Sequence, residues 1–541
     1  MKGLSTLKVA LLAILVVLGI AAVAFLLLST KAPTEEKAPV KEKVLIIGTT
    51  NIVKTDNLLK DYYMGIFAAI FTHDTLAIVD QGGNIVPSLV NWSSKDAKEW
   101  KLTLIRNATW HDGKPVTAED VAFTITYLKG KVPGYAIHLR LVRSVELVDD
   151  RTVLVKLDKE WASFPVVLAA IRLLPKHVWL KVDDPMTYSG EDRHIGCGPF
   201  KYGGFDPASG TMFFIANKNY WRGPPNVDKV VLKFYASTDA MLMALKRGDI
   251  AVTYTYAAGI DPAYVPSLLG EKGISFIVQP NFAVDNSLWF NYKRYPYNMS
   301  AFRKAISYAL DYESYVTLIA AGYAKVPSAG WIPDSWYYYV KKPFLVKNVT
   351  LAKSMLDSLG FIDRDSDGWR DYPNGTPFTM KILVRSDIPL TIRLAELIKR
   401  DLEAVNIRTQ LVPVDLSTFQ TILEQTKDYD VAISRTTFWG MLTYAGAGTL
   451  YFDSRGVGWA NVDDPSFHAL VDEILRTSDP KRIRKLYETL QDFYADNMYA
   501  IPLYWGMIIQ PYRSDMVDGF VYNPMLGILG RDTWYSVVVK A

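Results

Sequence analysis

Hydrophobic positions along the chain follow the two periods that distinguish strands from helices. Residues 99–105 (EWKLTLI) place an apolar side chain at every second position, as a half-buried strand does. Residues 44–48 form a short apolar run ending in glycine, which predicts the first strand. Residues 145–157 and 200–221 each contain two such runs around polar turn residues, so each predicts a hairpin.

Helix signals lie between these strands. Thr117 precedes Asp120 by three residues, which is the capping-box spacing, and predicts a helix over 118–129. A second predicted helix, over 240–247, ends at Gly248. Ser300 is expected to cap a third helix, over 301–310. The chain therefore mixes strands and helices along its length.

The N-terminus carries a long uncharged stretch. Lys2 and Lys8 precede Val9–Leu28, about 20 residues without a charge, which matches the thickness of a bilayer core. Because positive charges stay inside, the remaining chain is expected outside the cell. Small residues at 22–24 offer a signal-cleavage site, but the apolar run continues past it. We predict a transmembrane anchor or signal segment over 1–29, with retention favoured, and a charged linker over 30–43.

Composition excludes several classes of function. The 541 residues carry a formal charge of +4, which is too small and too evenly spread for a nucleic-acid partner. Such a chain is expected to form two or three domains. Cys197 is the only cysteine, so no internal disulfide can form, and no histidine motif activates it as a nucleophile.

Several motifs follow one another in a consistent order. They are Thr109–Val121 (TWHDGKPVTAEDV), Ile195–Phe200 (IGCGPF), 244–250 (ALKRGDI), 301–311 (AFRKAISYALD) and the helix Leu351–Leu359 with Gly360. Together they resemble the family 5 solute-binding proteins, the oligopeptide- and dipeptide-binding receptors of ABC importers. The resemblance covers nearly everything after Val44.

The resemblance implies an α/β, two-lobed, periplasmic-binding-protein-like (type II) fold with an extra inserted domain. Lobe one would comprise 44–288 and 502–541, with the inserted subdomain at about 74–190, and lobe two would comprise 292–500. Two crossing segments, near 290–291 and 501–504, would join the lobes. Ligand would lie between the lobes and be enclosed when they close.

The expected ligand site departs from the peptide receptors of this family. In those relatives an aspartate follows a Tyr-Asp segment and binds the peptide ammonium, whereas Trp439 occupies the matching position after Tyr429-Asp430. Aromatic residues cluster in predicted loops, and aromatic faces stack on sugar rings. An oligosaccharide and a peptide are therefore almost equally favoured as the ligand, with a slight preference for the oligosaccharide. The predicted ligand-binding residues are Trp439, Trp331, Tyr504, Trp505, Thr437, Trp336 and Asn291.

One acidic loop is a candidate metal site. Asp363, Asp365, Asp367 and Asp371 begin like a calcium loop, but position twelve is Asn374 instead of a bidentate glutamate. A solvated acidic loop is favoured, and a structural calcium ion is the alternative. No other cofactor is predicted, because the six histidines lack zinc-ligand spacing.

These observations favour a non-enzymatic receptor. We expect it to lie at the extracytoplasmic face, bind a small oligomeric solute and deliver it to ABC importer membrane subunits. The alternative is a membrane-anchored, glycosidase-like exoenzyme that uses the same aromatic cleft. Two carboxylates about 5–10 Å apart across that cleft would favour the enzyme.

Overall fold

The computed structural model describes residues 4–29, 42–336 and 338–540. It divides into two compact units, Met1–Glu42 and Lys43–Ala541. The first contains α1 (Leu4–Ser29). Among the described residues no helix has the length and apolarity that crossing a membrane requires, so the transmembrane part of the prediction is not supported. Residues 30–41 of the predicted linker lie outside the described residues.

The second unit is built on a mixed sheet of twelve strands. Its main path runs β16-β15-β17-β13-β18-β11-β1-β10-β9-β8, and β12 and β14 pair with β18 beside this path. The strands are β1 (Val44–Thr49), β8 (Phe200–Asp206), β9 (Thr211–Ala216), β10 (Lys229–Phe234), β11 (Val252–Tyr254), β12 (Ile274–Pro280), β13 (Asn286–Phe290), β14 (Ala324–Lys325), β15 (Thr379–Arg385), β16 (Arg408–Val414), β17 (Val431–Ser434) and β18 (Ala500–Arg513).

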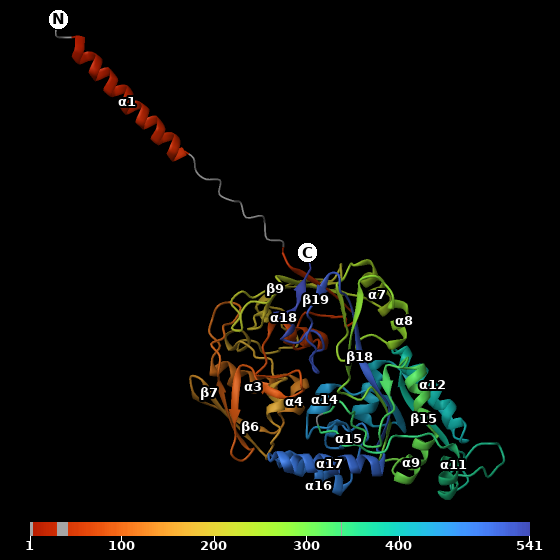
Figure 1. Ribbon diagram of the computed structural model, residues 1–541. Helices are drawn as coiled ribbons and strands as arrows, with labels where there is room; N and C mark the ends of the chain where they lie inside the picture. The colour runs from red at the N-terminus through yellow and green to blue at the C-terminus, as the bar shows by residue number, and fades with distance from the viewer. Residues whose placement is uncertain (1–3, 30–41, 337, 541) are drawn as a thin grey trace. The chain divides into compact units, whose positions relative to one another are not determined.

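Two parallel groups of strands form the two halves of this sheet. In the first half β1 pairs in parallel with β10 and β11, and in the second half β15 pairs in parallel with β16 and β17. The antiparallel strands β13 and β18 lie between the two groups. Figure 1 shows the long strand β18, drawn in blue, running through the middle of this unit.

The chain passes between the halves at two neighbouring places. β12 pairs with residues 507–513 of β18, whereas β13 pairs with residues 500–504. The passages therefore lie at residues 281–285, between β12 and β13, and at residues 505–506 within β18. The first lies a few residues before the predicted crossing at 290–291. The lobe boundaries themselves stay a prediction.

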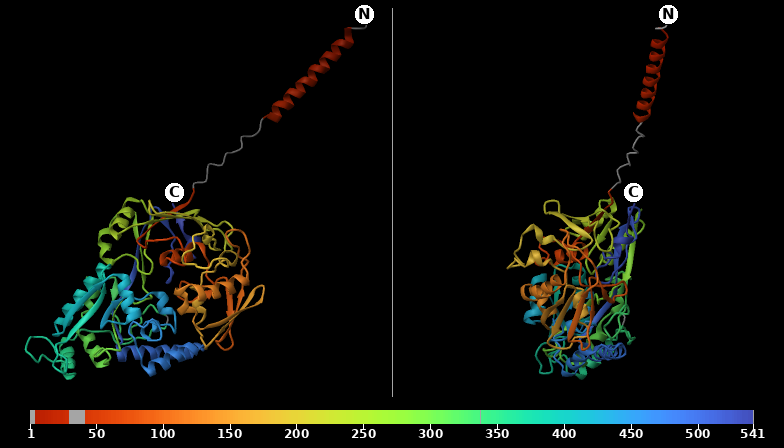
Figure 2. Two further views of the ribbon diagram at one scale, coloured as in Figure 1. Left: turned by 180° about the vertical axis from the view of Figure 1, so that it is seen from behind. Right: turned by 90° about the vertical axis from the view of Figure 1, so that its left-hand side faces the viewer.

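A separate four-stranded sheet lies inside the segment predicted as the inserted subdomain. It has the order β4 (Val90–Ser93), β5 (Glu99–Leu104), β7 (Thr152–Leu157) and β6 (Val142–Asp149), and α3 (Ala118–Lys131) and α4 (Pro133–Leu139) pack beside it. In the left view of Figure 2 this orange sheet lies on the opposite side of the body from the teal segment near residue 360. Two short hairpin-like pairs complete the strands: β2 (Ala77–Val79) with β3 (Ile85–Pro87), and β19 (Val517–Asp518) with β20 (Val538–Val539).

Helices cover the sheets. They are α2 (Tyr62–Phe67), α5 (Pro165–Leu168), α6 (Lys176–Trp179), α7 (Thr238–Arg247), α8 (Val265–Leu268), α9 (Ser300–Ala309), α10 (Tyr312–Leu318), α11 (Val349–Ser358), α12 (Pro389–Glu403), α13 (Leu416–Gln420), α14 (Phe438–Leu442), α15 (Thr449–Phe452), α16 (Pro465–Arg476), α17 (Pro480–Asn497) and α18 (Thr533–Ser536). Short π-helical turns η1 (Ala68–Thr72) and η4 (Thr421–Thr426) and 3-10 turns η2 (Glu191–His194) and η3 (Pro262–Tyr264) occur between them.

Local signals in the sequence account for several element ends. The helix predicted over 118–129 is confirmed as α3, and Asp120 Oδ2 accepts a hydrogen bond from Thr117 N at 2.9 Å. Gly248 ends α7 with a left-handed φ of 78°. Ser300 is the first residue of α9 instead of its cap, because the cap position is Met299, which makes no side-chain cap bond.

The central strand β13 is buried on both faces. Leu288 and Phe290 pack into one hydrophobic cluster of the second half, and Trp289 packs into another on the opposite face. Successive side chains of a strand point to opposite faces, so a continuous apolar run is what a doubly covered strand requires. The two clusters fix the second half of the sheet, and with it the position of the segment that follows β17.

Candidate functional site

The two passages between the halves are tied together by one carboxylate. Asp285 accepts hydrogen bonds from Gly506 N at 2.7 Å and from Asn281 Nδ2 at 2.9 Å. A Cβ on Gly506 would lie 2.7 Å from Asp285 Oδ2, so this close approach requires glycine. Burial raises the pKa of Asp285. Segments that cross between two halves and are linked in this way form a natural hinge region.

A narrow groove beside this hinge is lined from both halves. Its polar and aromatic lining includes Thr255, Gln510 and Tyr522 from the first half and Phe438 from the second. Gln510 lies on β18 with only 2% of its surface exposed, and its Oε1 has no hydrogen-bond partner among the described residues. A buried carbonyl without a partner is costly, so Gln510 is suited to accept a hydrogen bond from a bound molecule.

Tyr62, the first residue of α2, is an exposed aromatic residue whose hydroxyl is influenced by the second half. Its ring is 63% exposed and lies 6.2 Å from the Tyr256 ring. Surrounding protein nevertheless desolvates the hydroxyl and raises its pKa to about 12, with Tyr451 of the second half adding to the shift.

Arg435 is a free cation in the same region. It follows the carboxyl end of β17, is exposed, and forms no ion pair with the residues that the structure describes. Its guanidinium acts against the desolvation that raises the pKa of Tyr62 and of Asp285. Ligands of α/β sheets bind outside the carboxyl ends of the strands, and Arg435 occupies such an end.

A cavity of about 230 Å³ adjoins the groove. It lies between the β2–β3 hairpin, the end of α5 at Ala169, and the loop of residues 523–532. Met525 lines both the groove and this cavity. The tip of the hairpin reaches the second half, since a Cβ on Gly83 would lie 3.5 Å from the Phe438 ring.

Two of the predicted ligand-binding residues lie on the segment after β17. Trp439 is half-buried, and its ring lies 5.7 Å from that of His138 on α4. Thr437 accepts a hydrogen bond from Gly440 N at 3.1 Å and so caps α14. Their role as ligand contacts stays a prediction.

The other predicted residues are buried among protein side chains. Trp331 is fully buried, donates to Ser287 Oγ at 3.0 Å and packs on Phe452. Trp505 donates to the Trp331 carbonyl, Trp336 packs behind Phe438, Tyr504 bonds to Asn286, and Asn291 donates to the Lys427 and Tyr429 carbonyls. In this conformation none of these five offers its ring or amide to a solute.

Sequence reasoning missed the groove residues. Gln510, Tyr522 and Met525 carry no motif, and the predicted loops directed attention to the tryptophans instead. One signal was present, because Gln510 is the single polar side chain besides tyrosine before the final Arg513 of β18 (AIPLYWGMIIQPYR). A buried polar side chain within a strand needs a partner, and the residues that the structure describes supply none to Gln510 Oε1.

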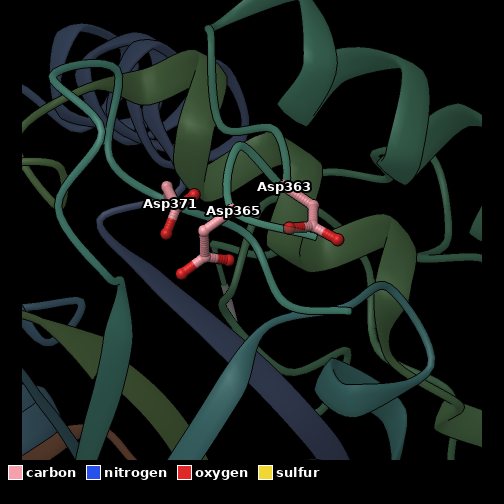
Figure 3. Close-up of side chains that lie close together, drawn as sticks. All are labelled: Asp363, Asp365 and Asp371. Atoms are coloured by element: carbon pink, nitrogen blue, oxygen red, sulfur yellow. The ribbon is translucent and has the colours of Figure 1, made fainter. Parts of the chain in front are cut away.

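The acidic loop brings together three of its four predicted ligands. Oxygen atoms of Asp363, Asp365 and Asp371 all lie within 4.8 Å of one another (Figure 3). Asp367 instead forms an ion pair with Arg408. Calcium binding by this loop stays a prediction.

Cys197, the cysteine for which no activating histidine motif was found, is buried. Burial raises the pKa of its thiol, and a thiol is a weaker nucleophile than a thiolate.

Comparison with known proteins decides the family. The sequence profile of the bacterial extracellular solute-binding proteins, family 5 (middle), matches residues 84–457. The chain is a family 5 solute-binding protein. This membership confirms the resemblance drawn from the motifs, and it favours a binding protein over the glycosidase-like alternative, which no comparison supports.

Relatives of this solute-binding protein include named peptide receptors. The oligopeptide-binding protein AppA of Bacillus subtilis is 24% identical over 81% of this chain and 80% of its own length. A putative ABC transporter peptide-binding protein of Brucella ovis is 25% identical, but the match spans only 59% of this chain and 58% of the relative. One solved form of the periplasmic oligopeptide-binding protein of Thermotoga maritima has a TM-score of 0.80 to this chain at 21% identity. The match covers 92% of this chain and all of that one.

The same fold has been solved around different ligands. AppA was crystallised with a nonapeptide, with a TM-score of 0.75 to this solute-binding protein. The Thermotoga maritima protein was also solved with mannohexaose bound, with a TM-score of 0.73. At 20% identity these likenesses establish the α/β binding-protein fold and leave the ligand of this chain open.

Proposed function

We propose that this protein captures a short oligomeric solute between its two halves and delivers it to the membrane subunits of an ABC importer. The observation that carries the proposal is the groove at the hinge. Gln510 of the first half and Phe438 of the second both line it, and the buried Gln510 Oε1 has no hydrogen-bond partner in the described part of the chain. A solute that contacts both halves stabilises the closed form, which is how hinge-type receptors respond to ligand. The lobes would keep the bounds given by the sequence, 44–288 with 502–541 and 292–500.

A peptide is the favoured solute. The preference for a sugar rested on tryptophans, and Trp331, Trp336 and Trp505 are buried in the protein. AppA and the Brucella protein carry peptide-binding names. An oligosaccharide remains the second candidate, because Trp439 is only half-buried and a structural neighbour holds mannohexaose.

A thermal-shift comparison tests the proposal. Short peptides and mannohexaose are added separately to the purified protein. A solute that binds only the native state raises the thermal midpoint by mass action, because it increases the free energy of unfolding by about 2.7 kcal/mol at 100 times Kd. We expect stabilisation by peptides. A Trp439→Ala substitution is expected to weaken the effect of the true solute. If neither class of solute shifts the midpoint, the receptor function is contradicted.

We further propose that the N-terminal segment stays attached and holds the receptor at the extracytoplasmic face. The support is the sequence itself: charges at Lys2 and Lys8 followed by an uncharged run through Leu28. The intact mass of protein isolated from cell membranes is expected to include residues 1–29. A mature N-terminus beginning just after Ala24 would overturn retention in favour of a cleaved signal.

A further inference from the structure

The cavity between the β2–β3 hairpin and the loop of residues 523–532 has mainly apolar walls. Its apolar walls are formed by Ile78, Val79, Val86, Ala169, Met525 and Leu526. They come from four separate segments: β2, β3, the end of α5, and the loop before α18. The cavity is therefore a built feature of the first half and is not a gap within one loop.

The polar residues that border this cavity are already satisfied by the protein. Asn523 donates to the Val79 carbonyl at 2.8 Å and accepts from Met525 N and Leu526 N, each at 3.0 Å. Thr75 donates to the Ala77 carbonyl at 2.6 Å. Bonds within the protein therefore hold both side chains in place.

The charged residues at its border are also engaged. Arg531 pairs with the buried Asp74 at 2.6 Å and donates to the carbonyls of Ala69 and His73. Asp532 pairs with Arg222, and Asp80 accepts hydrogen bonds from Gly82 N at 2.9 Å and Asn84 N at 2.8 Å. A charged or hydroxyl-rich guest would lose its water without gaining partners, and that loss is costly.

Volume limits what this space can hold. An apolar cavity of roughly 150 Å³ accommodates benzene, whereas complete small-molecule sites have volumes of about 300–1,000 Å³. The 230 Å³ found here lies between these values. The cavity is thus large enough for one branched or aromatic side group and too small for a whole oligomer.

Met525 connects this space to the site proposed for the solute. It lines both the cavity and the groove that contains Gln510. Methionine has three rotatable bonds and a polarisable sulfur, so it adapts readily to what lies beside it. A solute whose main chain bonds to Gln510 in the groove would have its side group directed past Met525.

Resting on the proposed function, we propose that this cavity is the side-chain pocket of the receptor, and that it selects peptides carrying a branched aliphatic or aromatic residue at one position. The Gln510 carbonyl bonds to a peptide N–H in the groove, and the apolar walls bind the side chain. A sugar ring does not fit this pocket, because its hydroxyls would be left without partners.

Calorimetry with matched peptides tests the proposal. The titrants are penta-alanine and its five variants that each carry a single leucine. At one position leucine is expected to bind about 10- to 60-fold more tightly than alanine, since three more carbon atoms leave water. The other positions are expected to differ by less than three-fold. A flat profile across all five positions overturns the proposal.

Two substitutions fill the pocket from different sides. Ala169→Leu acts from the end of α5, and Val86→Phe acts from β3. Each is expected to reduce the leucine preference below three-fold. Ala208→Leu, in the exposed turn between β8 and β9, is the matched control and is expected to keep the preference. Using both fillers keeps the test valid if one variant does not fold.

The outcomes separate the pocket from the receptor function. A folded filler variant that keeps the full leucine preference overturns the pocket assignment and leaves the receptor function intact. Binding of mannohexaose but of no peptide also overturns the pocket and supports an oligosaccharide receptor. Absence of binding by every peptide and by mannohexaose contradicts the receptor function itself.

Discussion

At the scale of single residues, two buried glutamines differ in whether the carbonyl of the side chain is hydrogen-bonded. Gln491 is fully buried, accepts from Val340 N at 2.8 Å and donates to the carbonyls of Tyr338 and Tyr487. Gln510 is equally hidden, but its Oε1 has no partner among the described residues. Burial alone therefore says little about function, whereas a buried carbonyl without a partner among the described residues is free to accept a hydrogen bond.

Replacing each glutamine by leucine is expected to give opposite results. Gln510→Leu removes an unsatisfied carbonyl, so the free energy of unfolding should rise by about 1 kcal/mol while solute affinity falls about ten-fold or more. Gln491→Leu leaves backbone groups without partners and should lower the free energy of unfolding by about 2–3 kcal/mol with unchanged affinity. Urea denaturation and calorimetry measure both quantities. Loss of stability in Gln510→Leu would indicate that its amide is structural.

Residue-level prediction from the sequence was weakest for the aromatic side chains. Trp331 and Trp505 resemble stacking platforms when their loops are read alone, and the structure packs both against other rings and carbonyls. The exposure of a side chain depends on which segments fold over it, and those segments come from all parts of the chain. A local motif therefore does not predict this exposure.

At the scale of elements, the segment after β17 depends on one glycine. A Cβ on Gly440 would lie 1.7 Å from the Tyr451 hydroxyl, and the Tyr451 ring is held against Trp459 at 4.1 Å. Gly440→Ala is therefore expected to displace Tyr451 and to destabilise the protein by about 1–3 kcal/mol. Gly130 in α3 has nothing within 4 Å of its Cβ position, so Gly130→Ala should stabilise by about 0.5–1 kcal/mol. Equal thermal midpoints for the two variants would contradict this account.

The acidic loop between α11 and β15 gives a second prediction for an element. Three carboxylates converge, but Asp367 is engaged with Arg408 and Asn374 replaces a bidentate glutamate. Calcium is therefore expected to bind weakly, at roughly 10⁻⁴–10⁻³ M. A few millimolar calcium should raise the thermal midpoint, and Asp365→Asn should abolish the effect while Asp387→Asn preserves it. An effect that survives Asp365→Asn would place the ion elsewhere.

Elements themselves were predicted better than residues. The Thr117–Asp120 pair and Gly248 act within one helical turn, so their consequences can be inferred from neighbouring letters. The position of the hinge is different in kind. It depends on how β12, β13 and β18 align, and residues 281–285 carry no hinge motif that distinguishes them from the predicted 290–291. Pairing between distant strands decides it.

At the scale of the whole molecule, the segment between β7 and α5 contacts the second half directly. Ala162 N donates to the Leu475 carbonyl at 2.6 Å, and Trp161 Nε1 and Ser163 Oγ both donate to the Tyr444 carbonyl, at 3.2 and 3.1 Å. The Arg140 guanidinium lies 4.9 Å from the centre of the Tyr444 ring. These contacts hold the two halves together on the side of the sheet β4–β7.

Weakening this contact is expected to affect release of solute more than its capture. The double substitution Trp161→Phe with Ser163→Ala removes both side-chain bonds to the Tyr444 carbonyl, each contributing about 1 kcal/mol. The dissociation rate should therefore rise about ten-fold or more, whereas the association rate, set by encounter with the open form, should change little. Trp100→Phe is the control, because Trp100 donates only to Ala97 within the four-stranded sheet. Stopped-flow fluorescence measures both rates. Equal dissociation rates in the double variant and the control would mean that the halves do not separate at this contact when solute leaves.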